Sequence, residues 1–185
     1  MNDSQTTTAP KPLTAEQLAS YSRPGSADMA PDGSRVAYVL APVSKAADKD
    51  NEHAVSAIWL VDAEDGEPRQ FTSGLWEDRE ARWSPDGERL AFLSDRAERG
   101  KHSVYVMSAA GGEGRRVFDQ EGSISNLRWS PDGRYLSFIF TDPETPEEKE
   151  RKENKDDVKV WDAELKWRRL WLIDLEDGNS ARAIS

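Results

Sequence analysis

The sequence predicts an all-β fold: a partial β-propeller of about three four-stranded antiparallel blades, preceded by a short helix. Three observations predict it. A hairpin motif occurs three times, at residues 29–33, 83–87 and 129–133, and its prolines lie 54 and 46 residues apart. A second strand–turn–strand pattern follows each hairpin. Repeats of about 40 to 50 residues that are built from short strands are typical of propeller blades.

Each hairpin motif has Pro-Asp-Gly at its turn. Proline sets φ to about −65° at the second position of a type I turn, and the aspartate accepts a following backbone N–H. The glycine adopts the positive φ that closes a three-residue hairpin with a bulge. Asp32, Asp86 and Asp132 are therefore predicted to be turn residues, because none has the series of oxygen ligands that a calcium loop requires.

The second pattern completes each blade. It occupies residues 58–72, 104–118 and 170–185, and its last strand is predicted to begin at Arg182. With the hairpins it gives four strands per repeat, and the predicted blades occupy residues 25–73, 80–119 and 123–185. Closed propellers have about four to eight blades, so the outer faces of the first and last blades are predicted to be uncovered. We therefore expect the chain to be a fragment of a larger protein.

The segment before the first blade has two predicted parts. Residues 1–12 form a disordered tail, and residues 13–24 form a short helix and a lead-in to the blade. The helix is predicted because Thr14 lies three residues before Gln17, which is the spacing of a capping box.

Two charged inserts, at residues 44–55 and 142–157, separate the second and third strands of their blades. Because both join the same pair of strands, both are predicted at the same edge of the propeller. The second insert has eight acidic and four basic residues, which favours a flexible charged surface loop. Long loops at one edge of a fold also often carry function.

Composition limits the classes of function. The net charge of −10 argues against a nucleic-acid partner, because no basic stripe faces a phosphate backbone. Cysteine is absent, which excludes disulfides and cysteine metal sites. The N-terminus lacks the basic and apolar regions of a signal peptide, and no apolar run has transmembrane length. We therefore expect a cytoplasmic protein without a membrane partner.

No catalytic, cofactor-binding or metal-binding residue is predicted. Residues 178–182 match only half of the Gly-x-Ser-x-Gly nucleophile motif and lie in a hairpin turn. Residues 111–114 lack the spacing and the lysine of a phosphate loop. His53 lies in an insert and His102 in the predicted turn of residues 100–102. Both are predicted to be ordinary surface residues, because neither has a recognisable partner in the sequence.

Three tryptophans lie close together near the C-terminus. Trp171 falls on a repeat position and is predicted to be part of the core. Trp161 and Trp167 match no repeat position. They are predicted either to cover a neighbouring element or to line an interface.

Residues 83–96 resemble the propeller of the prolyl oligopeptidase family, in particular its acylaminoacyl-peptidase and dipeptidyl-peptidase-like bacterial branch. Three further segments contribute to the resemblance: residues 13–33, 69–72 and 167–174. The first blade departs from the family pattern, because Met29-Ala30 precedes its turn. TolB-type propellers share the Trp-Ser-Pro-Asp-Gly repeat, so this repeat alone does not distinguish the two groups.

The resemblance implies a role. In such enzymes the propeller stands over an α/β-hydrolase domain and limits access to short peptides, and that domain supplies the catalytic triad. Its implied partners are the hydrolase domain, the remaining blades and short peptide substrates, with no cofactor. Two other hypotheses stay open: a non-enzymatic TolB-like scaffold for protein interactions, and a three-bladed unit that closes its ring by oligomerisation.

Overall fold

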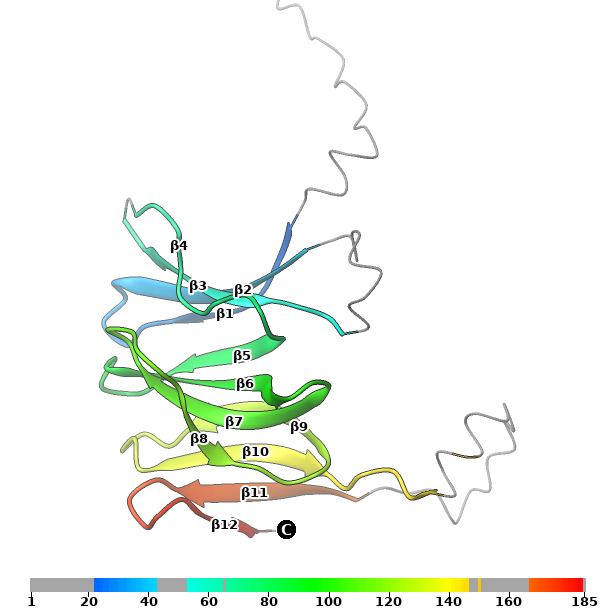
Figure 1. The fold of residues 1–185 in the computed structure, drawn as a ribbon. Coiled ribbons are helices and arrows are strands. Elements are labelled where there is room, and N and C mark those ends of the chain that lie inside the picture. The colour runs from blue at the N-terminus through cyan, green and yellow to red at the C-terminus, as the bar shows by residue number, and fades with distance from the viewer. Residues whose placement is uncertain (1–21, 43–52, 65, 147–149, 151–166, 185) are drawn as a thin grey trace, which may run out of the picture.

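The computed structural model describes residues 22–42, 53–64, 66–146, 150 and 167–184. These residues form three four-stranded antiparallel sheets, stacked one upon the next (Figure 1). This confirms the predicted all-β fold of three blades. Residues 1–21 lie outside the described part of the chain, so the helix predicted from residue 13 stays a prediction. Residues 22–24, the end of the predicted lead-in, belong to the first strand. No helix in the described part of the chain is long and apolar enough to cross a membrane.

Each blade contains four strands that follow one another in sequence. Blade one consists of β1 (Ser22–Met29), β2 (Arg35–Pro42), β3 (Ala57–Asp62) and β4 (Arg69–Gln70). Blade two consists of β5 (Asp78–Trp83), β6 (Arg89–Glu98), β7 (Lys101–Ser108) and β8 (Arg115–Phe118). Blade three consists of β9 (Ser123–Trp129), β10 (Tyr135–Thr141), β11 (Arg168–Asp174) and β12 (Ser180–Ala183). The last strand begins two residues before the predicted start at Arg182, because the turn already ends at Asn179, whose φ is 63°.

The Pro-Asp-Gly turns have the predicted chemistry. In blade two, Gly87 N donates to Ser84 O at 2.9 Å, and Asp86 Oδ1 accepts Glu88 N at 2.9 Å. Gly87 has a φ of +70°, a conformation that favours glycine. Blades one and three repeat these bonds with Asp32 and Asp132 as acceptors. The hydrogen bonds of the turn hold the pKa of each aspartate below its usual value.

The first strand of every blade contains a bulge that the sequence analysis missed. Its left-handed residue is not glycine: Ser26, Glu80 and Asn126 have φ values of 49°, 51° and 58°. Each lies three residues before the Met or Trp that precedes the turn. The strand pairing shifts register at the same places. Bulges increase local twist and redirect neighbouring side chains, so the repeat includes a backbone irregularity as well as a turn.

Two hydrophobic cores lie between the blades. The first packs blade one against blade two, and its larger buried members are Val39, Ile58, Leu60, Trp83, Leu90, Phe92, Tyr105 and Met107. The second packs blade two against blade three around Phe118, whose ring lies 4.8 Å from that of Phe138. Trp171 is partly buried against this second core, as predicted. Folding therefore depends on contacts between blades, as expected for stacked repeats.

Polar contacts recur at the two junctions between blades. Arg35 stacks on Trp83 of the next blade at 4.7 Å, and Arg89 stacks on Trp129 at 4.9 Å. Blade three has Tyr135 at the corresponding position. Its outward face also has an exposed isoleucine, Ile184, with 54% of its surface accessible. The third blade thus presents a face without the arginine that the first two blades use.

The strand ends that flank both inserts lie at one edge of the stack, together with the hairpin between β6 and β7 (Figure 1). We call this the insert edge. The Pro-Asp-Gly turns lie at the opposite edge. The insert residues 43–52 and 151–166 are outside the described part of the chain, so the predicted loop character of residues 142–157 stays a prediction.

Candidate functional site

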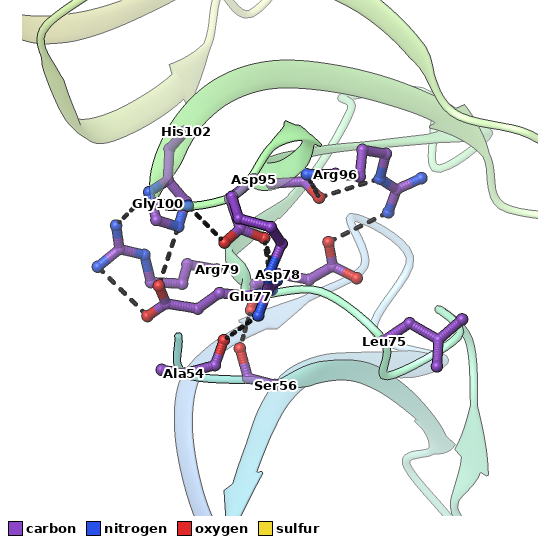
Figure 2. Close-up of polar contacts among 12 residues, drawn as sticks. Ala54, Ser56, Leu75, Glu77, Asp78, Arg79, Asp95, Arg96, Gly100 and His102 are labelled. Carbon is purple, nitrogen blue, oxygen red and sulfur yellow. Dashed lines mark hydrogen bonds and ion pairs between the residues drawn. The ribbon is translucent and has the colours of Figure 1, made fainter. Parts of the chain in front are cut away.

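A cluster of charged and polar side chains lies at the insert edge of blade two (Figure 2). It joins the linker before β5, the beginning of β5, the end of β6, the β6–β7 turn and the beginning of β7. We call it the rim cluster, and its members are Glu77, Asp78, Arg79, Asp95, Arg96, Arg99 and His102.

Asp95 connects the linker with the hairpin. Its carboxylate is fully buried. Oδ1 accepts Glu77 N at 2.8 Å and Arg99 Nη1 at 2.8 Å, while Oδ2 accepts Gly100 N at 3.0 Å. A buried carboxylate is tolerated when hydrogen bonds and a counter-charge surround it. One side chain therefore fixes two segments that are separate in sequence.

Asp78 is the second fully buried carboxylate. Its Oδ1 accepts Arg96 Nη2 at 3.1 Å, and Oδ2 has no hydrogen-bond partner among the described residues. The Arg96 guanidinium also lies 5.0 Å from the ring centre of Phe92 and 4.9 Å from that of Tyr105. Its Nε donates to Ser94 Oγ at 2.9 Å. Arg96 thus covers the aromatic core and compensates the charge of Asp78.

His102 corrects a prediction. It was expected at the surface in a turn without a partner, and this is wrong: it lies in β7 with a side chain only 9% exposed. The turn already ends at Gly100, so His102 points toward β5. Arg79 Nη2 lies 2.9 Å from Nδ1. Because arginine can only donate, Nδ1 accepts, and the neutral ring carries its proton on Nε2.

The surroundings of His102 favour the neutral ring. Burial and the positive charge of Arg79 lower the pKa of His102, while Glu77 and Asp95 act in the opposite direction. Nε2 lies 3.2 Å from Glu77 Oε2, within ion-pair distance, but has no hydrogen-bond partner among the described residues. This geometry agrees with the lowered pKa of His102, because its hydrogen bond comes from the positively charged Arg79.

Acidification is expected to weaken the propeller through His102. Its folded-state pKa is below the unfolded value of 6.5, so the unfolded chain binds the proton more readily. The contribution of His102 is complete above about pH 6.5 and falls as the pH decreases toward the folded-state pKa. Urea denaturation at pH 5 to 8 should show this slope, and His102→Gln should reduce it. His53→Gln is the matched control, because His53 is exposed; an unchanged slope in His102→Gln would contradict the assignment.

The returning end of the first insert is attached to the rim cluster. Ser56 Oγ donates to Asp78 O at 2.7 Å, and Arg99 Nη2 donates to Ala54 O at 3.2 Å. The Arg99 guanidinium also lies 5.5 Å from the ring centre of Trp76. The insert of blade one therefore returns to a surface fixed by blade two. This arrangement can hold the loops of the insert edge in a defined position.

The described residues of the rim cluster do not form a serine–histidine–aspartate arrangement. No histidine in the described part of the chain is hydrogen-bonded to a serine. Nor do the described residues include a group of three or more His, Asp or Glu side chains placed to hold a metal ion. The chemistry that the cluster supports is positioning through charge and hydrogen bonds.

The other sequence candidates are dispersed. Ser180 begins β12, and its hydroxyl donates to Asp177 Oδ2 at 3.1 Å. Gly111 and Gly112 form the turn between β7 and β8, with φ values of 104° and 108°. Trp167 is 73% exposed next to β11. Trp161 lies outside the described residues.

Comparisons with known proteins show which sequences and structures are similar to this chain. The chain is 35% identical over 86 residues to the uncharacterized peptidase YuxL of Bacillus subtilis (strain 168), which is 46% of this chain and 12% of that protein. A structure described as a TolB from Agrobacterium tumefaciens is similar with a TM-score of 0.60 and 21% identity, covering 88% of this chain and 48% of the other.

The acylaminoacyl peptidase of Pyrococcus horikoshii is similar with a TM-score of 0.58 and 20% identity, covering 89% of this chain and 24% of that structure. At such identities the structural likenesses concern the fold. The chain also spans less than half the length of each of these three relatives. The family model for the TolB beta propeller domain matches residues 15–160. The chain therefore belongs to the TolB β-propeller domain family.

Proposed function

We propose that this chain is the substrate-gating propeller of a serine peptidase that hydrolyses short peptides, of the acylaminoacyl- or dipeptidyl-peptidase kind. An α/β-hydrolase domain supplies the catalytic triad, and the protein acts in the cytoplasm. The observation that carries the proposal is the 35% identity to peptidase YuxL. The fold-level likeness to an acylaminoacyl peptidase supports it.

The open face of blade three supports the existence of further blades. Leu172 and Ile139 are half-buried, and Ile184 is exposed. The residues that occupy the corresponding strands of blade two pack against blade three. In a closed propeller a further blade covers such a face. The proposed partners are therefore the remaining blades and a hydrolase domain joined to them.

A TolB-like scaffold for protein interactions is the second candidate function. The family match and the likeness to the Agrobacterium tumefaciens protein favour it. The rim cluster suits either function, because it positions loops and has no catalytic group of its own. The two functions differ in one testable property, the presence of an activated serine on the same polypeptide.

One blot separates the two functions. An antibody to this segment measures the mass of the native polypeptide in soluble and envelope fractions of the source cells, and a fluorophosphonate probe labels activated serines on the same blot. A soluble band several times larger than 20.8 kDa that takes the label supports the peptidase. The label must appear in the native sample and disappear in the heat-denatured one. A band without label in the native sample contradicts the peptidase and leaves the scaffold.

A further inference from the structure

The first strands of the three blades form one continuous wall. β1 is the first strand of its sheet and contacts β5, and β5 contacts β9. In a propeller the first strands surround the central channel, which is a path along which a ligand can approach the interior. The charges on these three strands therefore decide which ligands the wall favours.

The acidic side chains of the wall are engaged within the protein. Asp28 Oδ2 accepts Trp83 N at 2.8 Å, and Glu80 Oε2 accepts Leu127 N at 2.9 Å. Both bonds connect one blade with the next. The carboxylate of Asp78 is fully buried and faces Arg96, as described above. Among the described residues, none of these three carboxylates forms an ion pair with an arginine of β5 or β9, and Asp78 pairs with Arg96 of the neighbouring strand β6.

Three arginines of the wall have no carboxylate partner among the described residues: Arg23 in β1, Arg82 in β5 and Arg128 in β9. Arg82 and Arg128 occupy equivalent positions of the repeat. Arg82 and Arg128 each lie immediately before the tryptophan that precedes the turn. Arg82 Nη1 donates to Ala81 O at 2.8 Å and to Ser26 Oγ at 3.3 Å, and Arg128 Nη1 donates to Leu127 O at 3.5 Å. No carboxylate of the described residues pairs with either guanidinium.

Arg82 and Arg128 follow the bulges of their strands at the same distance. The left-handed residues Glu80 and Asn126 lie two positions before Arg82 and Arg128. Each guanidinium then folds back on the carbonyl of the residue before it. Bulges that redirect side chains are frequent next to functional sites, and a left-handed conformation costs free energy in any residue other than glycine. The repeat keeps this conformation in all three blades. Two positions after it, blades two and three have an arginine, and blade one has Asp28.

We propose that Arg82 and Arg128 form a cationic strip on the channel wall that binds carboxylate groups of peptides. The strip gives the enzyme a preference for peptides with acidic side chains; this inference rests on the proposed function for its substrate. Guanidinium groups with free donors suit carboxylates, which accept two parallel hydrogen bonds. The net charge of the chain is −10, but distant acidic residues have little effect on a ligand at the strip. Charges that lie more than about 8 Å from each other are largely screened at physiological ionic strength.

The test uses the full-length polypeptide and two peptides of equal length, Ala-Glu-Ala-Glu-Ala and Ala-Gln-Ala-Gln-Ala, with binding measured by calorimetry and hydrolysis by chromatography. The acidic peptide is expected to bind about fivefold more tightly at low salt, with the difference decreasing as salt rises. In the double variant Arg82→Gln/Arg128→Gln the two peptides should bind within a factor of about two. Arg82→Lys/Arg128→Lys retains the charge and should keep most of the preference.

Arg116→Gln is the matched control, because Arg116 lies on the outer strand β8 and pairs with the exposed Asp119. Equal binding of both peptides by the wild-type protein, or an undiminished preference in the double glutamine variant, would overturn the proposal. Amidated peptides distinguish the sources of the carboxylate: a preference that survives amidation supports the side chains, and one that disappears overturns the assignment to acidic side chains. Charge-selective binding without hydrolysis contradicts the proposed peptidase alone, whereas hydrolysis without charge preference contradicts the strip alone.

Discussion

Replacing Arg96 with methionine is expected to lower the free energy of unfolding of the propeller by about 3 to 5 kcal/mol. Asp78 is fully buried, and Arg96 is its counter-charge at 3.1 Å. Methionine retains much of the contact with Phe92 and Tyr105, so the principal change is an isolated carboxylate in the interior. Urea denaturation followed by tryptophan fluorescence measures the effect.

Two further variants separate charge from packing. Arg96→Met/Asp78→Asn removes the buried charge together with its partner, so we expect it to be less destabilised than Arg96→Met. Arg116→Met is the control at an exposed ion pair, where the change should remain below about 1 kcal/mol. If the double variant is as unstable as Arg96→Met, the loss comes from packing and the assigned role of Arg96 is wrong.

The repeated part of the fold could be predicted from the sequence because its determinants are local. Pro85, Asp86 and Gly87 specify a turn through their own backbone preferences, and alternating apolar residues specify the strands on either side. The same pattern in each blade fixes the strand order. These contacts join residues that are near in sequence, so a short segment contains the information that forms them.

The rim cluster could not be predicted, because its contacts connect segments that no local pattern relates. Asp95 binds Glu77, which lies 18 residues earlier, and Ser56 binds Asp78, which lies 22 residues later. His102 was assigned wrongly because Gly-Lys-His is typical of a turn, whereas β7 already begins at Lys101. The bulges were missed for a related reason: Glu80 is not a residue type that favours a left-handed backbone. The signal that could have revealed them is their constant distance from the turn.

The insert edge and the channel wall have complementary physical roles. The charged side chains of the rim cluster form ion pairs and hydrogen bonds to the backbone. These contacts fix the position of the linker before β5 and of the β6–β7 hairpin. On the wall, by contrast, the carboxylates are engaged while Arg82 and Arg128 have no carboxylate partner among the described residues. In the proposed gating function, the insert edge selects ligands by size and the wall selects them by charge.

Removing the carboxylate of Asp95 is the second change with a large expected effect. Asp95→Ala removes the acceptor of the N–H groups of half-buried Glu77 and exposed Gly100, and a hydrogen bond to a charged group contributes about 1.5 to 3 kcal/mol. Arg99 also loses its ion pair, so we expect the propeller to be destabilised by about 3 kcal/mol or more. The linker before β5 and the β6–β7 hairpin should open together, since one side chain holds both.

Hydrogen exchange measured by mass spectrometry tests this coupling directly. Peptides that contain Glu77 and Gly100 should lose protection in Asp95→Ala, because both amides lose their acceptor. Asp95→Asn should give an intermediate loss, since its amide oxygen can replace only part of the acceptor set. Asp119→Ala is the matched control, because Asp119 is exposed and pairs with Arg116 at the surface. Loss of protection at only one of the two segments would show that they are held independently, and unchanged exchange at both would mean that Asp95 does not hold the rim in solution.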